Sequence, residues 1–259
     1  MRCQIIAECA SNHGGDLGLA TRMIEAAARA GADYVKFQSY QVRFLSPADP
    51  QYAWLRQAEL GAHGVKVLLA AATECGLKFM TTIFDREIVP VLLDLGVRAF
   101  KVGSGDSHRT ELLDVAPKGC ELFVSLPWGK GLPSAHPHGH TLATVPLYPM
   151  PLECYPFVAK QEGWSDHAVG LVAAQAAIVE GAHYVEKHFS LGGGQGGRVS
   201  VWDADEAALV ELVEFARDVS ILRTGNRYQS RWTGSVGRSS QGPPGASGAG
   251  GPSVPPPHP

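Results

Sequence analysis

Short runs of β-branched and aromatic residues alternate with stretches of helical periodicity through the first 224 residues of this chain. Eight runs have the length and composition of buried strands: 3–8, 33–38, 77–82, 98–103, 121–126, 142–148, 163–166 and 182–189. Helices are expected at 16–30, 51–74, 85–95, 168–180 and 203–222, with glycines where helices should end, at Gly31, Gly76, Gly96 and Gly181. Eight strand–helix units in one domain predict an α/β fold of the (β/α)8, or TIM-barrel, type.

The connections after the fifth and sixth predicted strands do not have helical sequences. The segment at 127–141 contains three prolines and three glycines, and proline cannot donate the backbone hydrogen bond that a helix interior requires. The segment at 149–163 leaves room for about two helical turns. The helices after strands five and six are therefore expected to be shortened or missing. Apolar strand surface left uncovered there favours a homo-oligomer in which another subunit covers it.

Composition limits the partners and the compartment of the chain. The 259 residues carry a formal net charge of -3 and no cluster of basic residues, which predicts no nucleic-acid or membrane partner and favours small molecules. No apolar run approaches membrane-spanning length, and five cysteines without a C-x-x-C pair are typical of a reduced, cytoplasmic protein. The barrel domain is expected at 1–224, and the Gly/Pro/Ser-rich composition of 225–259 predicts a disordered tail.

Alternation within the strands separates residues that face the helices from residues that face the barrel interior. In the second strand Val35 and Phe37 are expected to pack outward, which places Lys36 and Gln38 inside. The same reasoning places the Lys101 side chain, on the fourth strand, inside the barrel. Two lysines are therefore predicted to point into the barrel near the carboxyl ends of their strands.

The eighth strand ends in three charged or titratable residues, Glu186, Lys187 and His188. Lys187 lies on the outward face, so Glu186 and His188 face inward. Other strands also end in polar side chains, namely those of Glu8, Thr82, Ser125, Ser165, Asp166 and His167. Because uncompensated charges are costly to bury, this ring of polar groups predicts an active site at the carboxyl ends of the strands.

Two histidines, His167 and His188, end adjacent strands that lie about 4.8 Å apart, so both imidazoles can reach one cation. Two histidine ligands leave positions open for water and substrate oxygens, as in catalytic metal sites. A structural histidine pair with satisfied hydrogen bonds fits the sequence equally well. A second histidine-rich segment, HPHGH at 136–140, has no partnering carboxylate and is interpreted as a solvated loop.

The segment NHGGD at 12–16 precedes the first predicted helix. It has two interpretations, which are compatible with each other. The glycines suit a loop that binds phosphate at a helix start. The Asp16 side chain suits a helix N-cap.

Several segments of this chain occur together in the order that one family shows: IIAECASNHGGDLGLATRMIEAAARAGADYVKFQ, FMTTIFD, FKVGSGD, SDHAVG and GAHYVEKHF. The chain resembles the sialic acid synthase family, which includes N-acetylneuraminate synthase and its legionaminate and pseudaminate relatives. The resemblance covers about residues 3–190 and rests on the combination of motifs, because no single motif is specific.

The resemblance implies a TIM-barrel enzyme that condenses phosphoenolpyruvate with a sugar aldehyde such as N-acetylmannosamine, giving a 2-keto-3-deoxy sugar acid and phosphate. It implies a divalent metal, Mn²⁺ or Mg²⁺, bound by the residues that match the family's ligands, His167 and His188. It implies catalytic roles for Glu8, Glu186 and Lys101. It implies substrate contacts from Lys36, Gln38, Thr82, Lys101, Ser104, Ser125, Tyr148 and Ser165.

The sequence differs from the family pattern at three places. Pro146 replaces a polar residue of the sixth strand, SLGGGQGGRVS at 190–200 replaces a segment that reaches the sugar, and the family's C-terminal antifreeze-like domain has no counterpart, so we expect the barrel domain only. Two alternatives follow. One is a catalytically inactive ligand-binding or scaffold barrel, and the other is a metal-dependent aldolase or lyase that does not use phosphoenolpyruvate.

Overall fold

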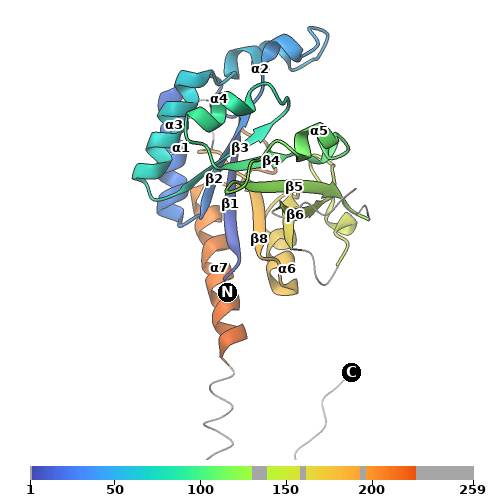
Figure 1. Cartoon of the computed structure of the whole chain (residues 1–259). Helices are drawn as coiled ribbons and strands as arrows, with labels where there is room; N and C mark the ends of the chain where they lie inside the picture. The colour runs from blue at the N-terminus through green and yellow to red at the C-terminus, as the bar shows by residue number, and fades with distance from the viewer. Residues whose placement is uncertain (1, 130–138, 158–161, 193–196, 226–259) are drawn as a thin grey trace, which may run out of the picture. The chain divides into compact units, whose positions relative to one another are not determined.

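All eight predicted strands are present in the computed structural model, which describes residues 2–129, 139–157, 162–192 and 197–225. They form a closed parallel barrel in chain order, in which the last strand pairs with the first (Figure 1). The strands are β1 Gln4–Ala10, β2 Tyr34–Ser39, β3 Lys78–Ile83, β4 Ala99–Val102, β5 Glu121–Pro127, β6 Gly139–Thr144, β7 Gly163–Asp166 and β8 Tyr184–His188. The predicted (β/α)8 barrel is confirmed.

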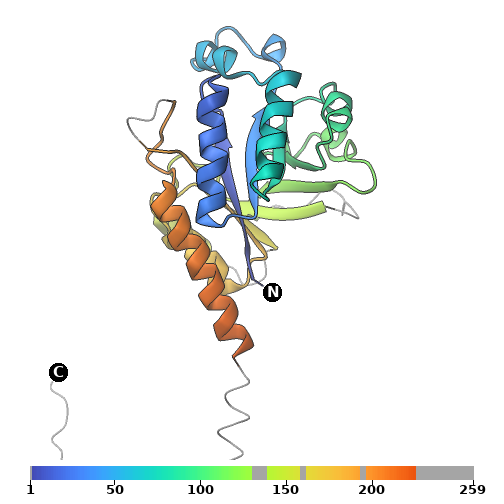
Figure 2. The same cartoon turned by 90° about the vertical axis from the view of Figure 1, so that its left-hand side faces the viewer.

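Helices lie outside the barrel, and α1 and α3 run side by side over its first strands (Figure 2). The helices are α1 Leu17–Ala30, α2 Tyr52–Ala58, α3 Ala62–Glu74, α4 Val89–Asp94, α5 Thr110–Leu113, α6 Val172–Glu180 and α7 Glu206–Thr224. The described residues between β5 and β6 contain no helix, and those between β6 and β7 contain only the 3-10 turn Leu152–Cys154. The prediction of shortened or missing helices is confirmed for this part of the chain.

Several predicted elements have the wrong bounds. Helix α4 begins at Val89 rather than at 85, and α6 begins at Val172 rather than at 168. The helix expected at 51–74 is two helices, because the chain turns at 59–61 and Gly61 begins α3 with an extended backbone. The sixth strand begins and ends earlier than the predicted 142–148, since Pro146 has no N–H to continue the ladder. The last helix begins at Glu206 rather than at 203, and Ala204 before it forms a parallel bridge with Phe189, directly after β8.

The interpretation of HPHGH as a solvated loop is wrong for its last two residues, while 136–138 lie outside the described residues. Gly139 and His140 belong to β6, and alternation turns the His140 ring into the barrel. The ring lies 4.7 Å from the centroids of both Phe123 and Tyr184, and its Nδ1 is 2.5 Å from Glu162 Oε1. His140 therefore packs within the barrel.

The barrel interior has an apolar layer below a polar layer, two residues apart on each strand. The apolar layer is one buried cluster formed by Ile6, Tyr34, Met80, Ala99, Phe123, Leu142 and Tyr184. Two residues further along, the same strands carry Glu8, Lys36, Thr82, Lys101, Ser125, Thr144 and Glu186, all buried. Because side chains alternate along a strand, the floor that fills the barrel also fixes the direction of the polar groups above it.

Lys187 faces away from this interior, as alternation predicted, and lies buried between the barrel and its outer layer. Its Nζ donates to Asp166 Oδ2 at 2.7 Å and to the Ala168 carbonyl at 2.5 Å, and both charged side chains are at most 1% exposed. Removing one partner of a buried ion pair leaves the other charge uncompensated. Loss of either partner alone should therefore destabilise the region of the seventh and eighth strands.

We expect Lys187→Met to lower the free energy of unfolding by roughly 3–5 kcal/mol, because the Asp166 carboxylate stays buried without its cation. Urea denaturation measures this change. A double variant that also carries Asp166→Asn should recover part of the loss. Lys78→Met is the matched control, since the Lys78 side chain is 56% exposed and its ion pair should be worth less than about 1 kcal/mol. Equal losses in both lysine variants would contradict this account.

The NHGGD segment packs against α2 and directly precedes α1. The Asp16 side chain accepts a hydrogen bond from Leu19 N at 3.0 Å, which confirms the predicted N-cap. Gly15 has a φ of 90°, and a Cβ there would lie 2.2 Å from the Gln57 carbonyl oxygen, so only glycine fits.

Within the described residues, no helix is long and apolar enough to cross a membrane, and the five cysteines are free. The predicted tail lies outside them from residue 226 onward.

Candidate active site

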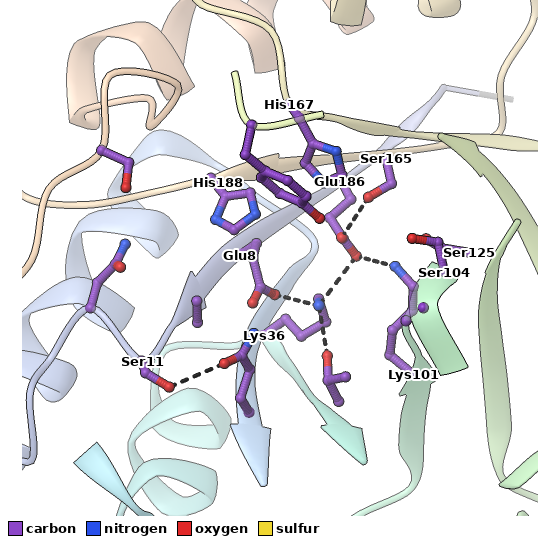
Figure 3. A pocket seen from close by; sticks show the side chains of 18 of the residues that line it. Glu8, Ser11, Lys36, Lys101, Ser104, Ser125, Ser165, His167, Glu186 and His188 are labelled. Atoms are coloured by element: carbon purple, nitrogen blue, oxygen red, sulfur yellow. Dashed lines mark hydrogen bonds and ion pairs between the residues drawn. The ribbon is translucent and has the colours of Figure 1, made fainter. Parts of the chain in front are cut away.

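A cavity of about 630 Å³ opens at the carboxyl ends of the strands (Figure 3). Twelve side chains that the sequence placed in the site line it, namely those of Glu8, Lys36, Gln38, Thr82, Lys101, Ser104, Ser125, Tyr148, Ser165, His167, Glu186 and His188. Asp166, which the sequence also placed in the ring of polar groups, does not line the cavity and pairs with Lys187 instead. The structure thus brings together residues that are spread over almost the whole barrel. Tyr148 belongs to the connection after β6 rather than to the predicted strand, but it still reaches the cavity.

Two lysines and two glutamates form a buried cluster at the base of the cavity. Lys36 Nζ lies 2.5 Å from Glu8 Oε2 and 3.5 Å from Glu186 Oε2, and it donates to Thr82 Oγ1 at 2.8 Å. Lys101 Nζ donates to Glu186 Oε2 at 2.6 Å. These groups come from neighbouring or facing strands, and the dashed lines in Figure 3 follow the network. The two lysines are thus linked to each other through Glu186.

Several polar atoms of the cavity-lining residues have no hydrogen-bond partner among the described residues. They include Glu8 Oε1 and Ser125 Oγ, and both of these residues are at most 4% exposed. By contrast, Glu186 Oε1 accepts a hydrogen bond from Ser165 Oγ at 2.8 Å. Because an unpaired buried polar group is costly, these atoms indicate a place for a polar ligand or water.

Burial and neighbouring charge drive the two carboxyl groups in opposite directions. Burial raises the pKa of Glu8 to about 7, although the adjacent Lys36 opposes the rise. Burial acts on Glu186 in the same direction, but Lys101 and Lys36 outweigh it and hold the pKa of Glu186 far below its usual range. Glu186 is therefore a fixed anion, whereas Glu8 exchanges a proton near neutral pH.

The pKa values of the two lysines are also shifted in opposite directions. Burial lowers the pKa of Lys101, with only partial compensation by Glu186. Burial also acts to lower the pKa of Lys36, but the carboxylates of Glu186 and Glu8 outweigh this effect and raise the pKa of that lysine. Two ammonium groups next to one permanent carboxylate make the cavity suited to an anion.

In metal-free protein, we expect the wild type to lose stability relative to Glu8→Gln as pH rises from about 4.5 to about 7. The pKa of Glu8 is raised from 4.5 to about 7 on folding, so over this interval the folded protein holds a proton that the unfolded chain has released. The resulting stabilisation is complete below the unfolded pKa and disappears above the folded pKa. Urea unfolding of both proteins at about pH 5 and about pH 8 measures it, and a pH-independent difference would contradict the assignment.

His167 and His188 lie next to each other at one side of the cluster, with ring centroids 5.6 Å apart (Figure 3). His167 Nδ1 is 3.2 Å from the Val145 carbonyl oxygen, and the Tyr148 ring covers the imidazole at a centroid distance of 4.0 Å. Burial lowers the pKa of both histidines, to about 3 for His188, which also lies near His167. Both rings are therefore neutral at physiological pH, and the neutral imidazole is the form that binds metal.

The two histidines fit a divalent cation as a partial ligand set. Their ring separation lets both nitrogens approach one ion at a bond length of about 2.1 Å with small side-chain rotations. Within the described residues, no group of three or more His, Cys, Asp or Glu side chains is placed to hold a metal ion. Any remaining ligands would be water or substrate oxygens, for which the open cavity has room.

Other cavity residues were not named as site residues from the sequence, although Asn12 belongs to the segment 12–16, which also suits a phosphate-binding loop. They are Ala10, Ser11, Asn12, Gln51, Trp54, Leu55, Phe84, Gly103, Gly105, Asp106, Arg198, Ser200 and Trp202. Most belong to loops or to α2, where strand alternation gives no information. One signal was available for the segment after β8: Gly197, with a φ of 77°, would place a Cβ 2.2 Å from the Asn12 carbonyl oxygen, so its glycine marks a close contact between two loops.

A closed parallel barrel with titratable groups gathered at the carboxyl ends of its strands has the architecture of a TIM-barrel enzyme. The chain belongs to the NeuB family, whose model matches residues 23–129 and 151–227.

Curated relatives and solved structures agree with this assignment. The N,N'-diacetyllegionaminic acid synthase of Campylobacter jejuni is 31% identical over 72% of this chain and 67% of its own length. The N-acetylneuraminate-9-phosphate synthase of Homo sapiens is 29% identical over 87% of this chain and 70% of its own. The solved spore coat polysaccharide biosynthesis protein SpsE of Bacillus subtilis superposes with a TM-score of 0.71 at 26% identity, covering 86% of this chain and 70% of that one.

Proposed function

We propose that this protein condenses phosphoenolpyruvate with the open-chain aldehyde of a sugar, giving a 2-keto-3-deoxy sugar acid and inorganic phosphate. The observation that carries the proposal is the buried pair Lys36 and Lys101 at the base of a cavity of about 630 Å³. The same cavity is lined by Ser125, whose hydroxyl has no hydrogen-bond partner in the described part of the chain. Membership of the NeuB family and the names of the relatives support this reaction class.

The charge of the cluster suits phosphoenolpyruvate. This substrate carries a phosphate and a carboxylate on three carbons, and ammonium and hydroxyl groups are strong donors to both. Lys36, Lys101 and Thr82 supply charged and neutral donors from adjacent strands. Ser125 and Ser104 extend the donor set along the cavity wall, and Ser125 Oγ is free to bond a ligand oxygen.

The reaction requires one carbon–carbon bond to form and one carbon–oxygen bond to break. Carbon 3 of phosphoenolpyruvate attacks the aldehyde carbon, and the carbonyl electron pair moves to the aldehyde oxygen, which takes a proton. Water then adds to the cationic carbon 2 and gives up its protons as the carbonyl forms and phosphate leaves. The site must therefore stabilise a positive charge at carbon 2 and move protons at two oxygens.

The opposite pKa shifts divide these tasks between the two carboxyl groups. Glu186 is held as an anion by Lys101, Lys36 and Ser165, so we assign to it the electrostatic stabilisation of the cationic carbon. Glu8 exchanges a proton near neutral pH and has an unpartnered oxygen, so we assign proton transfer to it. The negative charge of Glu186 also contributes to the raised pKa of Glu8.

A divalent cation, Mn²⁺ or Mg²⁺, would be held by His167 and His188, and when bound it supplies Lewis-acid polarisation of the aldehyde oxygen. The packing of Tyr148 on His167 fixes one of the two rings.

The acceptor sugar would occupy the outer part of the cavity, above the cluster. Gln38 accepts a hydrogen bond from Ser11 Oγ at 3.1 Å, and Arg198 donates to Gln51 Oε1 at 2.8 Å, so this wall offers amide, hydroxyl and guanidinium groups. Such groups suit a polyhydroxylated aldehyde. On the names of the relatives, we propose an amino sugar of the N-acetylmannosamine class.

Uniformly ¹³C-labelled phosphoenolpyruvate tests the reaction class. Incubation with an acceptor aldose and Mn²⁺ should give a product whose mass is the sum of the aldose and pyruvic acid labelled at all three carbons. Release of labelled pyruvate would show phosphatase chemistry instead. Condensation with labelled pyruvate itself would show an aldolase and contradict the proposal.

A further inference from the structure

The segment after β8 carries a buried carboxylate next to His188, the second of the two histidines. Ala204 N donates to the His188 carbonyl at 2.7 Å, and Ser190 N donates to the Ala204 carbonyl at 3.0 Å, so the chain before α7 is pinned along the end of β8. These bonds place the neighbouring Asp203 beside the His188 ring. The position does not depend on the Asp203 side chain.

The Asp203 side chain is 1% exposed, and hydrogen bonds reach one of its two carboxylate oxygens. Its Oδ2 accepts from Ser200 N at 2.8 Å and from Asn12 Nδ2 at 3.2 Å. Its Oδ1 has no hydrogen-bond partner among the described residues and lies 4.0 Å from His188 Nδ1. A buried carboxylate oxygen without a donor is costly. The Ser190 side chain also acts on this carboxylate, opposing the rise in its pKa that burial causes, and the His188 imidazole faces Oδ1 as a second available donor.

His167 shows the same arrangement with a different acceptor. Its Nδ1 lies 3.2 Å from the Val145 carbonyl oxygen, which can only accept. Thr144 Oγ1 lies 3.3 Å from the same nitrogen and already donates to the Ser165 carbonyl. His167 therefore carries its proton on Nδ1 and keeps the Nε2 lone pair for a ligand.

We propose that Asp203 is a positioning residue for His188, holding the imidazole with its Nδ1–H toward the carboxylate and its Nε2 lone pair free to bind a divalent cation together with His167. The inference rests on the metal site of the proposed function and adds a residue to it. Carboxylates that accept from the second nitrogen of a metal-binding histidine fix its tautomer and increase its basicity. The 4.0 Å separation is longer than a hydrogen bond, so the proposal requires the ring to turn until Nδ1 reaches the carboxylate.

Asp203→Asn tests the tautomer without removing the side chain. The asparagine carbonyl can still accept from Ser200 N and Asn12 Nδ2, which directs the new NH₂ group toward His188. A donor at that place favours the tautomer whose Nδ1 accepts and whose Nε2 carries the proton, and this tautomer cannot bind the cation. Two-bond ¹H–¹⁵N spectra of the metal-free proteins near neutral pH should show Nδ1–H for His188 in the wild type and a shift toward Nε2–H in the variant.

Titration with Mn²⁺ alone, followed by the electron paramagnetic resonance signal of the free ion, should show affinity weakened roughly 10–100-fold in Asp203→Asn. Asp203→Glu should recover part of the affinity. Asp205→Asn is the matched control, because Asp205 lies two residues away and its side chain accepts from Ala208 N at the start of α7. We expect that control to bind Mn²⁺ as the wild type does, and circular dichroism should be unchanged in all three variants.

The outcomes separate the inference from the proposed function. Wild-type tautomer and wild-type Mn²⁺ affinity in Asp203→Asn would overturn the role of Asp203 while leaving the metal site in place. A wild type that binds no Mn²⁺ would overturn the metal site itself, and with it the role of Asp203 toward a cation.

Discussion

Replacing His188 with alanine should lower turnover by roughly 10³-fold or more, because the cation would lose one of its two imidazole ligands and with it the polarisation of the aldehyde. The fold should survive the change. Burial lowers the pKa of His188 to about 3, so the ring is neutral and its removal takes no charge out of the interior, and the nearby Asp203 carboxylate keeps Ser200 N and Asn12 Nδ2 as donors. Initial rates of phosphate release at saturating phosphoenolpyruvate and Mn²⁺ measure the loss.

His183→Ala is the control for this experiment. His183 directly precedes β8 at the opposite end of the barrel and is exposed, so its removal should leave turnover unchanged. Far-UV circular dichroism and the unfolding midpoint should match the wild type for both variants. Turnover near the wild-type value in His188→Ala would rule out the proposed metal role.

Replacing Lys101 with methionine should weaken phosphoenolpyruvate binding by roughly 10²-fold, because each hydrogen bond to a charged group contributes about 1.5–3 kcal/mol. Methionine keeps most of the volume of a side chain that is 2% exposed. Glu186 keeps Ser165 Oγ at 2.8 Å and Lys36 at 3.5 Å, so its charge is not left without partners. Isothermal titration calorimetry with phosphoenolpyruvate measures the affinity directly.

Lys78→Met provides the comparison for this lysine. Lys78 begins β3 at the other end of the barrel and pairs with Glu121 at 3.1 Å, so it cannot contribute to binding in the cavity. Its phosphoenolpyruvate affinity should equal that of the wild type. Equal affinities for Lys101→Met and the wild type would show that the buried cluster is structural.

The sequence predicts the interior of the barrel well because strand alternation is a local and strict geometric rule. Once Val35 and Phe37 are placed outside, Lys36 and Gln38 have no other direction to point, and the structure places both in the cavity wall. The same rule separates Lys187, which forms an outer ion pair with Asp166, from the residues beside it.

Loops could not be predicted in the same way, because their positions depend on contacts between distant segments. Arg198 lies in the cavity wall because its backbone N donates to the Asn12 carbonyl at 2.7 Å, across almost the whole chain. Asp203 precedes an amphipathic segment and therefore has the sequence pattern of a helix start, but the helix begins three residues later. The strand error at β6 has a similar origin, since the apolar run continues through Val145 while Pro146 ends the ladder.

The homo-oligomer, the cytoplasmic location and the acceptor sugar remain predictions. Large apolar side chains are exposed after β5 and β6, with Trp128 39% and Phe157 76% accessible, which is consistent with the predicted gap in the helical layer. Sedimentation equilibrium of the full chain addresses the oligomer.

Inorganic phosphate release from phosphoenolpyruvate tests the central claim most directly. The assay should contain Mn²⁺ and a series of aldoses, including N-acetylmannosamine, mannose, arabinose and shorter sugars, with Lys101→Met and His188→Ala in parallel. We expect release that requires an aldose together with both side chains, and the aldose that supports the highest kcat/KM identifies the acceptor class. Release without any aldose, or equal release by the wild type and both variants, would contradict the assignment of this cavity as a condensing site.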